Sequence, residues 1–293
     1  MMPLTDDEKK LLEMALWQDS GKGDLTSCMF DGENGTAVII SEDDCILSGV
    51  EALEYIFDRA GAEVLSSEGA FPGCICGKDA VIATVKGPMQ ALLRAERVAL
   101  NVLSRMSGIA TMSRKASDIA ERVSPGTRVA GTRKTTPLFG TFEKRALMDG
   151  GALPHRPDLS SMAMLKDNHI AALGGGPDAI KDGVWNIRER YGLYVKIEVE
   201  VEDIPSGIAA VEAGADIIMM DNLSPRELMK ASVEIRRCAE ELGRGTILEA
   251  SGGITLDNLD LYAPHVDIVS MGSLTYAAPI ASFKMEYLTK NVQ

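Results

Sequence analysis

Apolar positions in the first hundred residues follow both a helical and an extended spacing. Residues 5–20 are apolar at 11, 12, 15 and 16, and Thr5 stands three residues before Glu8, the spacing of a helix capping box. Further helices are indicated near 51–60 and over 89–108, and runs bounded by glycine predict strands at 35–41 and 80–87. This part of the chain therefore mixes helices with strands.

From about residue 127 the pattern becomes strand, polar turn and helix, repeated. Six strands are predicted at 127–132, 162–165, 194–201, 216–220, 246–250 and 267–271, with helical stretches between them. Such alternation implies a parallel sheet. The segment is short for an eight-stranded barrel, which usually takes about 250 residues. An open doubly wound sheet and a reduced barrel are both compatible with this pattern.

Polar or glycine residues follow every one of these strands. The six strands end in or carry "GTRK" (131–134), "KDNH" (166–169), "EVE" (198–200), "DN" (221–222), "EASGG" (249–253) and "MGS" (271–273). The carboxyl ends of parallel strands share one edge, where α/β folds place their sites. An open sheet would need such residues only beside its switch point. Polar or glycine residues at all six strand ends therefore favour a sheet closed into a ring, with these residues around one opening, the mouth.

The residues at this mouth carry both signs of charge. The cations are Arg133, Lys134, Arg156 and Lys166, with His155 beside Arg156, and the anions are Asp167, Glu198, Glu200 and Asp221. Arginine pairs with carboxylates, lysine and glycine backbone meet phosphate, and Mg²⁺ prefers carboxylates beside phosphates. The pattern indicates a ligand with carboxylates and phosphates, and a divalent metal. A Schiff base at Lys134 or Lys166, as in barrel aldolases, is an open alternative.

Composition narrows the class of protein. The net charge of −13 argues against nucleic acid as a general partner, since phosphate-tracking surfaces are basic. No apolar run reaches membrane-spanning length, and the acidic N-terminus lacks the features of a signal peptide, so a cytoplasmic protein without a membrane partner is expected. The five cysteines, at 28, 45, 74, 76 and 238, are expected to be reduced.

Several motifs together resemble a known family. "GTRKTTP", "HRPDLSSMAMLKDNH", "IEVEVED", "ADIIMMDN" and "EASGGI" are similar to quinolinate phosphoribosyltransferase, the decarboxylating nicotinate-nucleotide pyrophosphorylase. "GDLTS" at 23–27, "VKGP" at 85–88 and "ERVALNVLSRMSGIAT" at 96–111 carry the same resemblance, which extends from about residue 17 to 276.

The resemblance implies an α/β fold with an N-terminal α/β sandwich domain (1–107, joined by 275–293) and an incomplete six-stranded α/β barrel (108–274). It implies a homodimer with shared active sites, in some members assembled into hexamers. The implied reaction joins quinolinate and phosphoribosyl pyrophosphate, with Mg²⁺, to give nicotinate mononucleotide, pyrophosphate and CO₂. This reaction belongs to NAD biosynthesis.

The resemblance also implies roles for individual residues. The pyridine dicarboxylate would be held by Arg133, His155, Arg156 and Lys166, with Arg97 reaching in from the neighbouring subunit, although periodicity alone places Arg97 on a solvated helix face. Glu200 and Asp221 would lie near the ribose and the metal, assisted by Asp167. Phosphate would be met by Lys134, Ser251, Gly252, Gly253, Gly272 and the residue at position 276. The residues expected to act in catalysis are Lys134, Lys166, Glu200 and Asp221.

The sequence departs from the family pattern at three places. Tyr276 stands in "SLTYAAP" where the family commonly has a histidine, "GGALPHR" differs from the usual "GGGxxHR", and "TTPLFGTF" replaces "TTPGLR". Tyrosine can donate a hydrogen bond but is not cationic near pH 7. The alternatives are a paralogous group found with molybdate-transport genes, a transferase for another base, and an inactive phosphate-ligand binding protein. Both KDNH and HR are present, which argues against the paralogous group.

Overall fold

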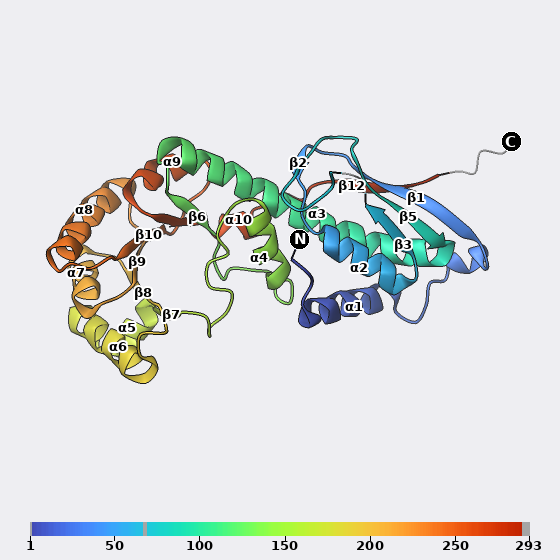
Figure 1. Ribbon diagram of the computed structural model, residues 1–293. Coiled ribbons are helices and arrows are strands. Elements are labelled where there is room, and N and C mark those ends of the chain that lie inside the picture. Colours follow the sequence, from blue (N-terminus) through green and yellow to red (C-terminus); the bar gives the residue numbers. More distant parts are fainter. Residues whose placement is uncertain (1, 67–68, 289–293) are drawn as a thin grey trace. The chain divides into compact units, whose positions relative to one another are not determined.

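The computed structural model describes residues 2–66 and 69–288, which form two compact units (Figure 1). Unit 1 consists of residues up to 114, 135–151 and from 274 onward, and unit 2 consists of residues 115–134 and 152–273. The expected division into 1–107 and 108–274 did not separate residues 135–151, which belong to unit 1. Each unit is described by itself below.

Unit 1 is built on a four-stranded antiparallel sheet in the order β12-β1-β5-β3. Its strands are β1 (Asn34–Ser41), β3 (Glu63–Ser66), β5 (Val81–Pro88) and β12 (Phe283–Tyr287), so that the strand latest in the chain pairs with the first. A short antiparallel pair joins β2 (Cys45–Ile46) to β4 (Ile75–Cys76). The helices are α1 (Asp6–Ser20), α2 (Val50–Ala60), α4 (Gly140–Asp149) and most of α3 (Met89–Val123), with the short η1 (Ser27–Phe30) and α10 (Ser273–Tyr276).

The predicted start of the first helix is confirmed. The Thr5 hydroxyl accepts a hydrogen bond from the Glu8 N–H at 3.2 Å, and the Glu8 carboxylate accepts one from the Thr5 N–H at 2.7 Å. These reciprocal bonds satisfy two backbone donors that a helix leaves unpaired at its N-terminus. Gly21 ends the helix, with its N–H donating to the Trp17 carbonyl at 3.0 Å.

The helix predicted over 89–108 is longer than expected. Helix α3 continues through Gly108 to Val123, a length of 35 residues. A side chain at Gly108 would collide with the backbone of Pro279, so this glycine allows a close approach of two segments of unit 1. A glycine that lies in a helix for packing reasons looks in the sequence like a helix end.

Unit 2 contains one parallel sheet of six strands in the order β6-β11-β10-β9-β8-β7. The strands are β6 (Arg128–Ala130), β7 (Ala163–Leu165), β8 (Ile197–Val201), β9 (Ile217–Asp221), β10 (Ile247–Ser251) and β11 (Ile268–Ser270). The intervening helices are α5 (Asp167–Ala172), α6 (Gly176–Tyr191), α7 (Ile204–Ala213), α8 (Pro225–Glu241) and α9 (Leu259–Tyr262), followed by η2 (Ala263–His265). Figure 1 shows α6, α7 and α8 along the outer side of the curved sheet.

The sheet is an incomplete barrel. Strands β6 and β7 stand at its two edges, and the described residues form no ladder between them, so the fully closed ring favoured by the six polar strand ends is not formed. An isolated parallel bridge between Ala130 and Leu153 instead places the segment after α4 beside β6. The predicted α/β fold with a six-stranded parallel sheet is confirmed.

The two faces of this sheet differ in polarity. Side chains alternate between faces along a strand, and residues paired in register share a face. Val199, Ile218, Leu248 and Val269 are buried on the face covered by the helices. Glu198, Glu249 and Ser270 are also buried, and by the same alternation they project from the opposite, inner face.

No helix in the described part of the chain is long and apolar enough to cross a membrane.

Candidate functional site at the carboxyl edge of unit 2

Lys166 and Glu200 form an ion pair at the carboxyl ends of neighbouring strands β7 and β8. Lys166 is the residue before α5, and its backbone N–H donates to Nδ1 of His169 at 3.0 Å. The first turn of α5 therefore contains Asn168 and His169, and His169 contributes by fixing the backbone of Lys166. The sequence placed these polar residues after a strand but did not predict this contact.

Arg133 follows β6, and Arg156, whose guanidinium contacts Met162 and Met164 beside β7, adds positive charge near Glu200. The segment that leads to Arg156 lies beside β6, because Leu153 donates to Val129 at 2.8 Å and accepts from Gly131 at 2.9 Å. The Arg156 guanidinium is buried and donates to the Met162 carbonyl at 3.1 Å. Burial and the nearby Arg133 guanidinium lower the pKa of Arg156. The structure thus brings together two arginines that are 23 residues apart in sequence.

His155 lies between two buried carboxylates on the inner face. Its Nε2 is 3.5 Å from Glu198 and 3.2 Å from Glu249, and all three side chains are at most 7% exposed. Burial lowers the pKa of His155, but the hydrogen-bonding contacts and charges of both glutamates outweigh it and raise the pKa to about 9. Nδ1 accepts the Arg156 N–H at 2.8 Å, which favours a neutral ring. In either protonation state, the ring carries a proton on Nε2 that faces the carboxylates.

The predicted phosphate-binding glycines lie at the ends of β10 and β11. Gly252 and Gly253 have φ of +95° and +63°, a region that favours glycine. The Ser251 carbonyl accepts the Asn222 N–H at 3.0 Å, and a Cβ at Gly252 would lie 2.6 Å from that same nitrogen. Gly272 lies against the side chain of Lys134. These four backbone positions and Lys134 form one glycine-lined part of the edge, as the sequence indicated.

The three acidic residues predicted to bind metal are placed differently from one another. Glu200 is the last but one residue of β8, Asp221 is the last of the neighbouring strand β9, and Asp221 accepts from the Asn222 amide at 2.7 Å. Asp167 is exposed at the start of α5. Among the described residues, the three metal-type side chains whose donor atoms lie within 4.8 Å of one another are His155, Glu198 and Glu249. The carboxylate oxygens of Glu200 and Asp221, on neighbouring strands, suit Mg²⁺, whereas Asp167 lies on the helix α5.

Two predicted site residues, Arg97 and Tyr276, belong to unit 1. Arg97 is exposed on α3, as helical periodicity alone indicated, and Tyr276 is 64% exposed at the end of α10. Neither is part of the carboxyl edge formed within unit 2 by Arg133, Lys134, His155, Arg156, Lys166, Asp167, Glu200, Asp221, Ser251, Gly252, Gly253 and Gly272.

Sequence reasoning missed Glu249 and Ser270 as members of the site. The Ser270 hydroxyl is hydrogen-bonded to Glu249, and both side chains are buried. The available signal was the alternation along β10: Glu249 precedes Ser251 by two residues and therefore shares its face.

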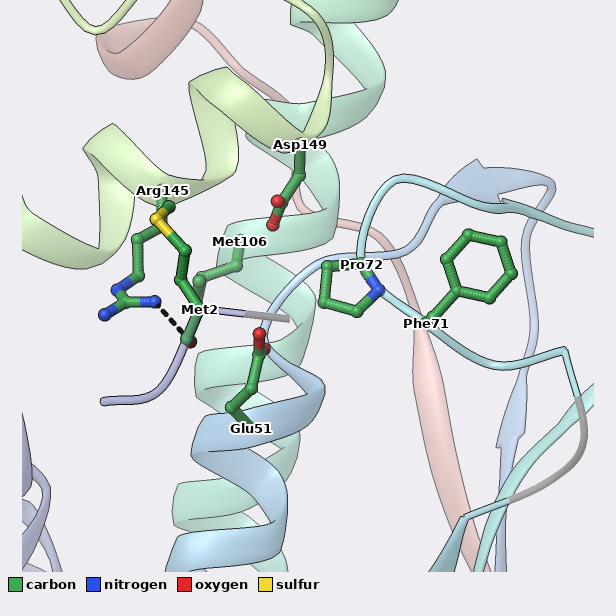
Figure 2. Close-up of a pocket in the computed structure, with 7 residues that line it drawn as sticks. All are labelled: Met2, Glu51, Phe71, Pro72, Met106, Arg145 and Asp149. Atoms are coloured by element: carbon green, nitrogen blue, oxygen red, sulfur yellow. Dashed lines mark hydrogen bonds between the residues drawn. The ribbon is translucent and has the colours of Figure 1, made fainter.

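Unit 1 contains a separate pocket of about 390 Å³ (Figure 2). Figure 2 shows the Glu51 and Asp149 carboxyls in this pocket, and burial raises the pKa of both. Arg145 also lines it, but its guanidinium is already paired with Glu8, with Nε 2.6 Å from the carboxylate. None of the residues predicted from the sequence to act in the site lines this pocket: its walls are Met2, Glu51, Phe71, Pro72, Met106, Arg145 and Asp149.

Comparison with known proteins identifies similar chains. Residues 24–107 match the family model of the quinolinate phosphoribosyl transferase N-terminal domain, and residues 109–286 match that of its C-terminal domain. The human carboxylating nicotinate-nucleotide pyrophosphorylase is 42% identical over 72% of this chain and 69% of its own length. The Dictyostelium discoideum enzyme of the same name is 36% identical over 92% of each chain. The crystal structure of NadC from Streptococcus pyogenes superposes with a TM-score of 0.87 at 30% identity, over 99% of this chain and 100% of that one.

Proposed function

Because the chain belongs to the quinolinate phosphoribosyl transferase family, we propose that it transfers the phosphoribosyl group of phosphoribosyl pyrophosphate to quinolinate. The products are nicotinate mononucleotide, pyrophosphate and CO₂, in a step of NAD biosynthesis. The observation that carries this proposal is the carboxyl edge of unit 2, which holds two arginines, a lysine and a glycine-lined segment suited to phosphate.

Arg133 and Arg156 suit the two carboxylates of quinolinate, since guanidinium groups bind planar carboxylates in pairs of hydrogen bonds. Arg156 is held by Met162 and by a 3.3 Å contact to the Met164 sulfur, so its orientation is fixed before a ligand arrives. Lys166 adds a positive charge, and His155 lies beside Arg156 in the chain. A pyridine held by fixed cations gains rate from orientation alone.

The glycine-lined segment and Lys134 suit the phosphates of the second substrate. In the transfer, the pyridine nitrogen bonds to the ribose carbon while the bond from that carbon to pyrophosphate breaks. Fixed positive charge stabilises the departing pyrophosphate. The ring nitrogen then carries a positive charge, which stabilises the electron pair left on the adjacent carbon when its bond to CO₂ breaks, and a proton from solvent takes up that pair. No protein base is needed for these steps.

Glu200 and Asp221 are the residues we expect to hold Mg²⁺. Their carboxylates end neighbouring strands and offer the hard oxygen ligands that this ion prefers. When bound, Mg²⁺ would neutralise charge on the pyrophosphate. Because Lys166 is paired with Glu200, the lysine and the ion compete for one carboxylate, and we expect Lys166 to shift toward the substrates.

The second part of the proposal is a cytoplasmic homodimer in which each site is completed by Arg97 of the other subunit, with a hexamer as a further assembly. Support comes from the exposure of Arg97 and of several large apolar side chains of unit 1, since exposed apolar surface marks interaction sites. These side chains are Trp17 (75% exposed), Leu25 (92%) and Met29 (68%). Sedimentation of the wild-type chain measures the oligomeric state.

The test is a substrate comparison on the purified chain. Quinolinate or nicotinate is offered with phosphoribosyl pyrophosphate and Mg²⁺, and the nucleotide and CO₂ are measured. We expect more product from quinolinate than from nicotinate. Nicotinate has a single carboxylate and would leave one of the two arginines without a partner. Preference for nicotinate would favour a transferase for another base, and ligand binding without any product would favour an inactive binding protein.

Variants test the assignment of residues. Arg133→Ala and Arg156→Ala are expected to lose most turnover with quinolinate, whereas Arg190→Ala, an exposed arginine near the end of α6, serves as the control. Normal turnover in both site variants would contradict the assignment. The Tyr276→His variant is expected to keep its activity. Complete loss of activity in this variant would show that the tyrosine has a role of its own.

A further inference from the structure

Glu198 is a buried carboxylate whose ion pair with His155 is loose, at 3.5 Å. Its side chain is 0% exposed, and neither of its oxygens accepts a hydrogen bond from the described residues. Burial raises its pKa, and the nearby His155 opposes this rise. A buried carboxylate without hydrogen bonds costs several kcal/mol, and an apolar side chain of similar size would avoid that cost. The position is therefore poorly explained by stability alone.

His155 is the residue that both buried glutamates face. It has a left-handed backbone with φ of +56°, a conformation that costs about 1 kcal/mol or more for a residue other than glycine. Such a conformation persists where its surroundings fix it. Here Nε2 faces Glu198 and Glu249, and Nδ1 accepts from the backbone of Arg156. Glu249 is itself fixed by the buried hydroxyl of Ser270.

The same contacts fix the backbone position of Arg156. Its backbone N–H is bound to the His155 ring, and the ring is held from the other side by the two carboxylates. The guanidinium uses one donor on Met162 and one on Met164, and it has five N–H donors in all. A shift of the His155 ring would therefore displace the backbone of an arginine whose remaining donors are available to a ligand.

We propose that Glu198 and Glu249 are positioning residues, which hold the His155 ring and thereby set the place of Arg156 at the carboxyl edge of unit 2. This inference rests on the proposed function, since the ligand that Arg156 meets is taken to be the pyridine dicarboxylate. Glu198 and Glu249 act through His155 and do not themselves touch the substrate.

A metal ion bound by the same three side chains is the competing explanation. Metal ligation through Nε2 requires the ring proton to be on Nδ1. Nδ1, however, faces the Arg156 N–H at 2.8 Å, and two donors would then oppose each other. The geometry therefore favours a proton on Nε2 over a metal ion.

The activity test uses Glu198→Gln and Glu249→Gln, which keep the shape of the side chain and remove its charge. The control is Glu202→Gln, an exposed glutamate that follows β8. We expect KM for quinolinate to rise about tenfold to a hundredfold in both site variants, because small displacements of binding groups have effects of this size. KM for phosphoribosyl pyrophosphate should stay within about twofold, a split that general destabilisation would not produce.

A second measurement does not depend on activity. The chain has three histidines, so ¹H–¹⁵N spectra of their rings can be assigned by His155→Gln. We expect a protonated Nε2 on His155 in the wild type, and a changed Nε2–H signal in both glutamine variants but not in Glu202→Gln. If one variant fails to fold, the other and the wild-type spectrum still test the proposal.

The outcomes separate the two hypotheses. Unchanged KM for quinolinate in both folded variants would overturn the positioning role. An unprotonated Nε2, or one equivalent of Mn²⁺ or Zn²⁺ that binds without substrates and is lost in His155→Gln and Glu249→Gln, would overturn it in favour of a metal site. A wild-type chain that is inactive with quinolinate but shows the expected Nε2–H signals would contradict the proposed function, while leaving the His155 contacts supported.

Discussion

Arg105 on α3 and Glu143 on α4 form an ion pair inside unit 1, with Nη2 of the arginine 2.8 Å from the carboxylate. The Glu143 side chain is 0% exposed and also accepts the Thr136 N–H at 2.9 Å. Arg105 donates in addition to the Thr275 carbonyl at 2.7 Å. The pair thus fixes two segments that are adjacent in sequence to the predicted phosphate-binding residues Lys134 and Tyr276.

Replacement of Arg105 by alanine should lower the free energy of unfolding by about 3 kcal/mol, because removing one partner leaves a buried charge uncompensated. Urea unfolding followed by circular dichroism measures the change. The control is Arg237→Ala, which removes an exposed pair with Glu234 and should change stability by less than about 1 kcal/mol. Equal changes in the free energy of unfolding would show that the buried Arg105–Glu143 pair stabilises the fold no more than the exposed pair does.

Gly252 and Gly253 should respond differently to alanine. Both have positive φ, but a Cβ at Gly252 would meet the backbone of Asn222, whereas a Cβ at Gly253 would have no neighbour within 4 Å. Gly252→Ala should therefore displace the end of β10 from the residue after β9 and raise KM for phosphoribosyl pyrophosphate by about tenfold or more. Gly253→Ala should show mainly a backbone strain of about 1 kcal/mol. Steady-state kinetics and thermal unfolding of the two variants make the comparison, and a larger kinetic effect of Gly253→Ala would contradict it.

Chelation of divalent metal should abolish the proposed transfer, and added Mg²⁺ should restore it. Glu200→Gln and Asp221→Asn should each need more Mg²⁺ for half-maximal rate, because each removes one carboxylate ligand. Asp167→Asn should have the smaller effect, since Asp167 is exposed at the start of α5 and is not on a strand of the sheet. Activity of the wild type in excess chelator would contradict the requirement for metal.

The cysteines of unit 1 should differ in their pH-dependent reactivity. Burial raises the pKa of Cys45 to about 12, and it also raises that of Cys76, its cross-strand partner. Because the thiolate is the reactive form, both should resist a disulfide reagent at pH 8 and become reactive only as the pH nears their raised values or the chain unfolds. The exposed Cys28 should react first.

Peptide mapping after timed labelling identifies which thiol has reacted. Cys28→Ser should remove the fast phase of thiol labelling and leave the slower phases unchanged. Rapid modification of Cys45 in the folded chain at pH 8 would contradict its burial.

The sequence predicted the strands of unit 2 well because each is a short apolar run followed by polar residues. It placed Lys166, Glu200 and Asp221 at strand ends correctly, since the ends of parallel strands must share an edge. It did not predict that Lys166 would pair with Glu200, because a pairing between neighbouring strands depends on sheet order, which the local pattern does not contain.

Other features could not be read from spacing. Glu198 and Glu249 lie on β8 and β10, strands that are separated in the sheet by β9, and only the curvature of the sheet brings their side chains to one histidine. The spacing predicts that a helix ends at Gly108, because the contact that explains this glycine is made with a segment 171 residues away in sequence. The exposure of Arg97 agrees with helical periodicity, but a role in a neighbouring subunit cannot be seen in one chain.

The pairing of β12 with β1 has a consequence for how the chain is made. Tyr287 on β12 is paired in register with Ala37 on β1, so this sheet joins residues 250 positions apart in sequence. During synthesis, the outer side of β1 has no partner until every residue of unit 2 has left the ribosome. Unpaired strand edges are sites of aggregation, and distant pairings form slowly. We therefore expect the edge of β1 to stay exposed in the newborn chain until β12 has been made.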